Sequence, residues 1–224
     1  MKKVTAISAI ISGTALLIWW WSFLLFPGFR KLFVEFNLFI TMEESGINTD
    51  YIATVAQPLW VYVNLFMVIA ILGGLIFTLF YFKLYIKDES RKEIVMAILL
   101  MTGYFIYCGI AFYETFLWPA LAKDFPSAIS FTGPVYTGKL WLSSNIIGIM
   151  AYWIGNLMLG FHFIKNINRT GGLLFAIGVS VICVGYFLSG FIMIRYLIQS
   201  IGISLFAFGF IVIGVKIMRS SFAK

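Results

Sequence analysis

The chain is poor in charge. Only 11% of its 224 residues are Asp, Glu, Lys or Arg, whereas 62% are hydrophobic, and the mean hydropathy is +0.99. A soluble domain carries about 25% charged residues, so this chain has too few to cover a water-facing surface. The shortage excludes a soluble enzyme or binding module and leaves no room for a separate soluble domain. We expect residues 1–224 to form a single integral membrane domain.

Histidine and cysteine are equally scarce, with His162, Cys108 and Cys183 as the full set. One histidine cannot supply the two axial ligands of a haem bundle, and diiron or zinc sites need several converging His or carboxylate groups. Both cysteines lie in apolar runs without a CxxC motif, so we interpret them as buried hydrophobic residues. We expect no metal and no other cofactor. Because no acid–base pair is visible, an enzyme is the least favoured function.

Six apolar segments are long enough for a bilayer crossing, which takes about 20 residues of helix. They run from about Val4 to Phe26, Leu59 to Tyr85, Ile94 to Leu121, Trp141 to Ile164, Leu173 to Ile194 and Tyr196 to Met218. The first follows Lys2 and Lys3, but its apolar run is too long for a signal peptide. The predicted fold is therefore an all-α, polytopic bundle of six transmembrane helices.

Basic residues predict the orientation of this bundle. With the N-terminus inside, eleven of them are cytoplasmic and five are outside; the eleven are Lys2, Lys3, Lys83, Lys87, Arg91, Lys92, Lys165, Arg169, Lys216, Arg219 and Lys224. We therefore expect both termini to be cytoplasmic. Because the charges lie in short turns instead of on one face, we expect no nucleic-acid partner.

The predicted outer connections are longer than the inner ones. Residues 29–40 place their large apolar side chains on one arc, as in an amphipathic helix that lies in the outer interface. The Phe-Pro and Gly-Pro breaks in the loop from Lys123 to Lys139 exclude a simple helix there. We expect this loop to pack over the bundle.

One carboxylate, Glu114, lies deep in an apolar run, in the stretch AFYETFLWPALAKDFP (111–126). Side chains spaced three and four residues apart share a helix face, so those of Tyr107, Glu114 and Trp118 should face the same way. The predicted topology brings amide and hydroxyl groups of other helices to the same outer half of the membrane. We predict an outward-facing polar pocket lined by five residues: Glu114, Asn64, Tyr107, Tyr152 and Asn145.

Two interpretations of this set stay open. Polar side chains in a bilayer are costly and usually face the bundle interior or water, which favours a ligand or proton site. Alternatively, Glu114 reaches toward the interface or pairs with Lys123 or Lys139, and the amides only tie helices together. In a ligand site, Glu114 would act either as a protonated donor or as an anion that attracts a cationic or hydroxyl-bearing ligand.

Three further features are explained by membrane packing. The run Trp19-Trp20-Trp21 lies near the outer end of the first helix, where tryptophan is enriched. His162 is expected at the cytoplasmic end of the fourth helix, as a hydrogen-bonding residue of the interface. Glycines at seven-residue spacing should permit close helix contacts; they are Gly148 and Gly155, then Gly202 and Gly209.

The stretch GNLMLGFHFIKNINRTGGLLFAIGVSVICVG (155–185) resembles uncharacterised bacterial six-helix membrane proteins, in which a Gly-rich helix ends in a short basic turn before a second Gly-rich helix. The resemblance implies a location in the bacterial inner membrane and carries no activity.

Two functions are consistent with these observations. The first is the binding or transport of a small molecule or lipid in the outer polar pocket. The alternative is a non-catalytic subunit or scaffold that binds a partner membrane protein through its aromatic surface and outer loops.

Overall fold

A computed structural model describes residues 1–26, 29, 53–86, 90–124, 139–187 and 192–222, with the backbone alone at 139–145, 186–187 and 192–195. All regular structure in these ranges is helical. The elements are α1 (Lys2–Leu25), α4 (Pro58–Tyr85), α5 (Arg91–Phe112), the π-helical segment η1 (Tyr113–Leu117), α6 (Trp118–Asp124), α8 (Lys139–Asn166), α9 (Arg169–Phe187) and α10 (Ile192–Phe222). The amphipathic helix predicted at 29–40 and most of the second outer loop lie outside the described ranges.

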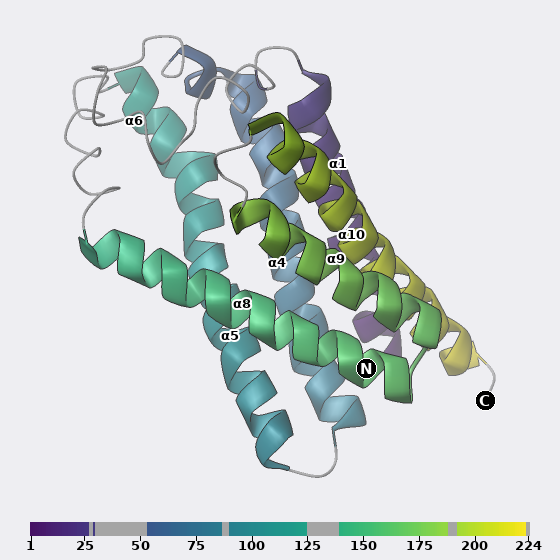
Figure 1. Cartoon of the computed structure of the whole chain (residues 1–224). Coiled ribbons are helices and arrows are strands. Elements are labelled where there is room, and N and C mark those ends of the chain that lie inside the picture. The colour runs from purple at the N-terminus through teal and green to yellow at the C-terminus, as the bar shows by residue number, and fades with distance from the viewer. Residues whose placement is uncertain (27–28, 30–52, 87–89, 125–138, 188–191, 223–224) are drawn as a thin grey trace.

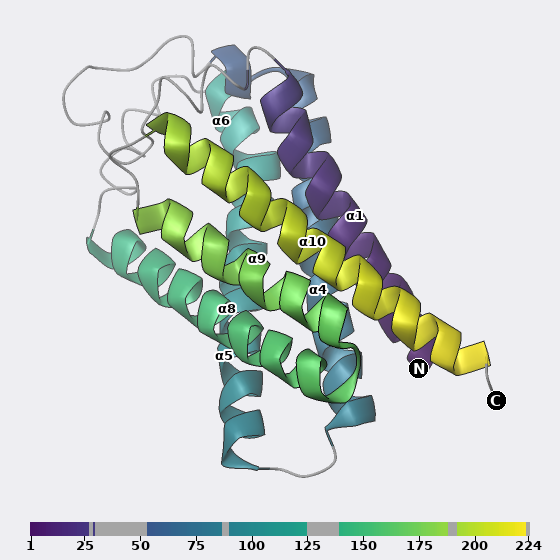
Figure 2. The same ribbon diagram turned by 45° about the vertical axis from the view of Figure 1, so that its right-hand side comes forward.

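The helices form a closed ring (Figure 1). Going around it, α4 packs on α1, α1 on α10, α10 on α9, α9 on α8, α8 on α5, and α5 again on α4. The segments α5, η1 and α6 follow one another as a single long rod, and α8, α9 and α10 run side by side and cross α4 and α5 at an angle (Figure 2). The two chain ends lie at the same end of the bundle, which we call the terminal end; η1 and α6 lie toward the opposite end.

Five helical stretches of the described chain are long and apolar enough to cross a membrane: Lys2–Leu25, Pro58–Tyr85, Arg91–Asp124, Ile146–Asn166 and Tyr196–Phe222. The apolar part of α9, Arg169–Gly185, is shorter. The all-α fold is confirmed, and these five helices are compatible with the predicted membrane class by length and composition; the count of six spans stays a prediction.

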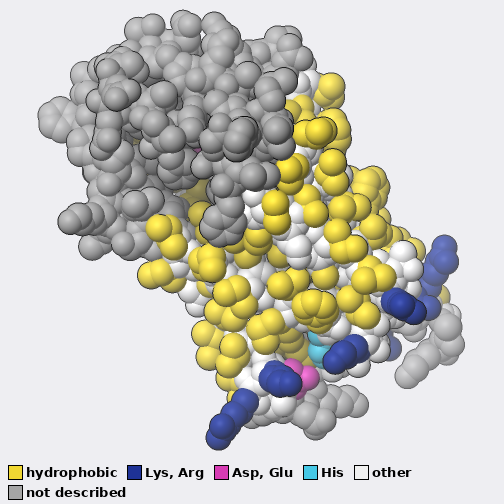
Figure 3. Space-filling model, viewed as in Figure 1, with side chains coloured by type: hydrophobic (Ala, Val, Ile, Leu, Met, Phe, Trp, Pro, Cys, Tyr) yellow, Lys and Arg dark blue, Asp and Glu magenta, His cyan; other side chains and the backbone are white. Residues whose placement is uncertain are grey.

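Charge is distributed as the predicted topology requires. The structure describes nine of the eleven basic residues that were predicted to lie on the same side of the membrane. They lie at the starts of α1, α5 and α9 and at the ends of α4, α8 and α10. All of these helix ends lie at the terminal end of the bundle. On the face shown in Figure 3, the basic side chains gather there around the histidine, and the surface between them and the grey atoms is largely hydrophobic.

Small residues bring the helices into close contact. A Cβ on Gly73 of α4 would lie 3.2 Å from Ser12 of α1, and one on Gly209 of α10 would lie 2.6 Å from the Phe175 nitrogen of α9. Gly148 and Gly155 meet α5 in the same way, and Gly202 meets α9, which confirms the packing predicted for the four spaced glycines. Close backbone approach of this kind supports helix association in lipid through van der Waals packing, because apolar side chains gain little by leaving the bilayer.

Large aromatic rings fill the centre of the ring of helices. Phe77, Phe163, Phe175 and Phe210 are almost fully buried and meet edge to face, with ring centroids 4.8–5.8 Å apart along the series. This spacing is typical of favourable aromatic pairs. The series joins α4, α8, α9 and α10 into one core.

The helix boundaries follow the prediction to within a few residues, except at the connection between the last two helices. The sequence places the junction of the last two helices at Arg195, whereas α9 ends at Phe187 and α10 already begins at Ile192. Arg195 therefore lies in the first turn of α10. The predicted third helix, 94–121, corresponds to the continuous run of α5, η1 and α6.

Candidate functional site

Glu114 lies where the third membrane span changes its helical register. The backbone N–H of Trp118 donates to the carbonyl of Tyr113, five residues earlier, which is the π-helical pattern. In an α-helix the same N–H would instead donate to the carbonyl of Glu114. If the π-helical pattern continued, residue 119 would be the donor to the Glu114 carbonyl, but it is a proline and has no N–H.

The indole of Trp60 supplies the missing donor. Its Nε1 donates to the Glu114 carbonyl oxygen at 2.9 Å, across the contact between α4 and η1. Trp60 is only 6% exposed, and its ring meets those of Phe23 and Phe29 edge-on. The register change at Glu114 is therefore held in place by a buried side chain from another helix. The Glu114 side chain itself is half-buried.

Asn64 extends this connection to α1. It is 2% exposed; its Nδ2 donates to the Trp60 carbonyl at 2.9 Å, and its Oδ1 accepts from Trp19 Nε1 at 3.2 Å. Trp19, Asn64 and Trp60 thus link α1, α4 and η1 by hydrogen bonds. Asn64 has the helix-linking role that was the alternative to ligand binding.

The tyrosines predicted for the site form a second cluster nearer the middle of the bundle. The rings of Tyr107 on α5 and Tyr152 on α8 lie 4.6 Å apart, and Tyr152 also meets Tyr104 edge-on at 5.1 Å. Tyr104 is 1% exposed. Tyr107 and Glu114 are seven residues apart along the same rod, or about 10 Å at 1.5 Å per residue. Asn145, the fifth predicted residue, lies on α8, and its side chain is outside the described set.

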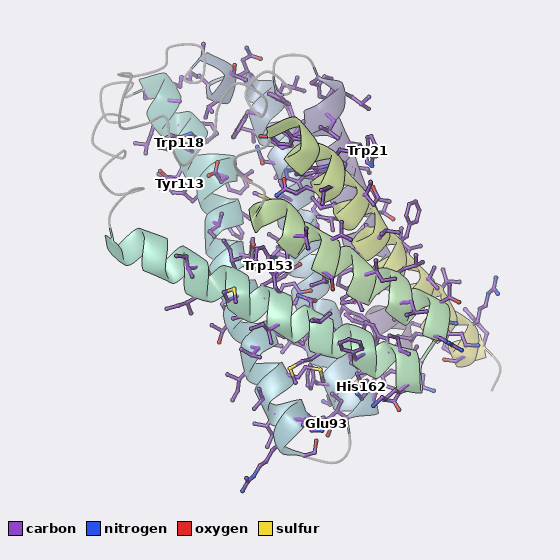
Figure 4. The ribbon with its side chains drawn as sticks, viewed as in Figure 1. Trp21, Glu93, Tyr113, Trp118, Trp153 and His162 are labelled. Atoms are coloured by element: carbon purple, nitrogen blue, oxygen red, sulfur yellow. The ribbon has the colours of Figure 1, made fainter. Side chains whose placement is uncertain are left out.

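The other two tryptophans of the run bind α10. Trp20 Nε1 donates to Ser200 Oγ at 2.9 Å, and Trp21 Nε1 donates to Ser204 Oγ at 3.3 Å. Figure 4 shows Trp21 beside α10, while Tyr113 and Trp118 mark the region around Glu114 and His162 lies far below, near Glu93. The tryptophan run therefore ties α1 to both of its neighbours, a role that enrichment at the interface does not predict.

Sequence reasoning missed Trp60 and the π-helical segment. The signal that points to them is Pro119, because a proline within an apolar helix leaves a carbonyl that needs a donor from elsewhere. Among the described residues, no three His, Cys, Asp or Glu side chains converge as a metal site would need. No protein-family model, curated protein or solved structure matches the chain.

Proposed function

We propose that this chain is a six-span protein of the bacterial inner membrane, with both termini cytoplasmic, that binds a small organic cation at Glu114 and moves it across the bilayer. The site faces outward; the Tyr107–Tyr152 ring pair, about 10 Å away along the rod, forms a separate cluster. Asn64 holds α1 and α4 in position below it. The supporting observation is the π-helical segment at Glu114.

The rarity of a π-helical turn and of an acidic residue within a membrane span supports a functional role for Glu114. π-helical turns within α-helices are rare and occur frequently at functional sites. An acidic residue inside a membrane span is also rare, and it usually marks a pathway or a ligand. Here both occur at one residue, and a buried tryptophan satisfies the carbonyl that the register change leaves without a backbone donor.

The surroundings favour an organic cation over other ligands. The ionised Glu114 carboxylate would provide the opposite charge, and the half-buried ring of Tyr113, next to it in the chain, would provide a face to which a cation is attracted. The Tyr113 ring is held in place by the buried Trp118, with ring centroids 5.6 Å apart.

The test measures equilibrium binding of choline, tetraethylammonium and spermidine to the purified full-length protein in nanodiscs. We expect at least one of the three to bind, and Glu114→Gln to weaken its Kd by about tenfold or more, because losing one partner of a desolvated charge pair costs about 2–5 kcal/mol.

Glu93→Gln is the matched control. It removes a carboxylate near the terminal end of the bundle, while glutamine keeps the capping box that Glu93 forms with Ser90. Its affinity should equal that of the wild type. The proposal is wrong if none of the three cations binds, or if Glu114→Gln binds as tightly as Glu93→Gln.

The second candidate is a non-catalytic subunit of a membrane complex. Its support is the exposure of the third candidate span. Only 28% of the most apolar stretch of this span is buried, against 39–50% in the other four candidate spans. Phe105, Phe112 and Phe116 are exposed there. Isolation from native membranes in a stoichiometric complex, with cross-links from Phe105 to another chain, would favour this candidate.

A further inference from the structure

Four basic residues meet where the first and last helices lie side by side. α1 and α10 pack against each other in opposite directions, so that the start of one adjoins the end of the other at the terminal end of the bundle (Figure 2). Lys2 and Lys3 begin α1, and Lys216 and Arg219 lie in the last turns of α10. We call these four residues the basic corner.

The alignment of the two helices brings the two basic pairs together. A Cβ on Gly214 of α10 would lie 2.8 Å from the carbonyl oxygen of Ala6 on α1, so these two residues lie at the same level. Because the helices run in opposite directions, Lys3 lies level with residue 217, between the two basic residues of α10. The Lys3 Nζ also lies 5.0 Å from the centroid of the Phe222 ring, which agrees with this alignment.

No acidic side chain of these two helices neutralises the basic corner. Neither α1 nor α10 contains Asp or Glu. Within the described part of the chain, the acid at the terminal end is Glu93 on α5, which interacts electrostatically with His162 on α8. Lys3, Lys216 and Arg219 are exposed. The basic corner is therefore a solvated positive patch that attracts an anion.

An exposed apolar strip begins directly beside the basic corner. Side chains four residues apart share a helix face, so Ile7 lies one turn from Lys3, and Val215 lies one turn from Arg219. Ile7 is 47% exposed and Val215 is 37% exposed, and the strip continues along α10 with Phe208. Both helices contain a stretch long and apolar enough to cross a membrane. In a bilayer the strip would face acyl chains, with the basic corner at the membrane surface.

The combination of charge and apolar surface fits a lipid better than a soluble anion. A phospholipid carries its phosphate next to its acyl chains, so one molecule can contact both the basic corner and the apolar strip. A soluble phosphate would use the charges and leave the strip uncovered. Basic residues close to a membrane surface attract anionic lipids, and basic pockets between membrane helices bind headgroups that carry two phosphates.

We propose that the basic corner and the apolar strip together form a binding site for an anionic phospholipid. The phosphate lies among the four cations, and an acyl chain lies along the strip. Four cations exceed the charge of one phosphate, so a headgroup with two phosphates binds more tightly than a headgroup with one. The bound lipid contacts both α1 and α10 and stabilises the contact between the first and last helices. This site does not depend on a ligand at Glu114.

The experiment measures lipid binding to the full-length protein in detergent by native mass spectrometry, with cardiolipin, phosphatidylglycerol and phosphatidylcholine as probes. We expect cardiolipin, which has two phosphates, to bind most tightly, and the zwitterionic phosphatidylcholine to bind least tightly. The double variant Lys3→Gln/Arg219→Gln should weaken cardiolipin binding by about 30-fold, as for about 1 kcal/mol per basic side chain. Both side chains are exposed, so the variant should keep the fold.

Lys92→Gln/Lys165→Gln is the matched control. It removes the same amount of charge from exposed side chains at the same end of the bundle, but from α5 and α8 instead of α1 and α10. The net charge of the protein is therefore the same in the two double variants, and only the position of the lost charges differs. The affinity of the control for cardiolipin should equal that of the wild type.

The proposal is overturned if phosphatidylcholine binds to the wild type as tightly as cardiolipin does. It is also overturned if the two double variants weaken cardiolipin binding equally, because the overall charge of this end would then act without a specific site. Inorganic phosphate tests the other source of the same chemistry. Added in excess over cardiolipin, it should leave the lipid bound; displacement of the lipid would mean that the basic corner binds soluble phosphate instead.

Discussion

Replacing Trp60 by phenylalanine tests the account of the π-helical segment. The substitution removes the indole N–H that donates to the Glu114 carbonyl at 2.9 Å, while a ring remains to pack against Phe23 and Phe29. Pro119 prevents the backbone from supplying a donor in its place. The Glu114 carbonyl is then left without the one donor that the register change requires.

The expected loss follows from that single bond. An unsatisfied buried carbonyl costs about 1–3 kcal/mol, and hydrogen bonds between membrane helices have measured about 0.6 kcal/mol on average and about 1.7 at most. We therefore expect Trp60→Phe to lower the free energy of unfolding by about 1–2 kcal/mol. Equilibrium unfolding in mixed micelles, followed by circular dichroism, measures it.

A second substitution makes the prediction specific. Pro119→Ala restores a backbone N–H, so the Glu114 carbonyl gains a donor from residue 119 in π register or from Trp118 in α register. Trp60→Phe should then cost about 0.6–1.7 kcal/mol less in the Pro119→Ala background than in the wild type. Additivity of the two changes within about 0.5 kcal/mol would refute the assigned role of Trp60.

Three further predictions concern the packing of the bundle. Trp20→Phe removes the 2.9 Å bond to Ser200 and should cost about 1 kcal/mol of unfolding free energy. Gly178→Ala places a methyl group against the backbone of α10 and should lower the free energy of unfolding by about 1–3 kcal/mol. Gly109→Ala meets open space and should leave it unchanged or raise it by up to about 1 kcal/mol. Thermal melts measure both, and effects of the opposite sign would contradict the packing. Ser90→Ala removes the α5 cap and should cost about 1 kcal/mol, with Ser90→Thr close to the wild type in the same assay.

Apolar length and basic turns predict the described helices of this chain and the grouping of their ends, because both depend on local composition. The connection between α9 and α10 is the exception. The pair Ser189-Gly190 is a turn signal, but the prediction placed the boundary at the charged Arg195, which lies within α10.

The candidate site was predicted less completely, because its organisation depends on contacts between distant residues. Helical periodicity places Tyr107 and Glu114 on one face of an ideal α-helix, but the register change at Tyr113 depends on Pro119 and on a tryptophan 54 residues away. Asn64 illustrates the same limit: its depth is readable from the sequence, whereas the bond that it accepts from Trp19 forms only when α1 and α4 pack.

Infrared difference spectroscopy upon cation binding tests the role of Glu114 most directly. The full-length protein is perfused with whichever of choline, tetraethylammonium and spermidine binds most tightly, and the carboxylate bands are compared between wild type, Glu114→Gln and Glu93→Gln. We predict a carboxylate difference signal in the wild type and in Glu93→Gln that is lost in Glu114→Gln. A signal that persists in Glu114→Gln, or none in the wild type, would contradict a cation site at Glu114.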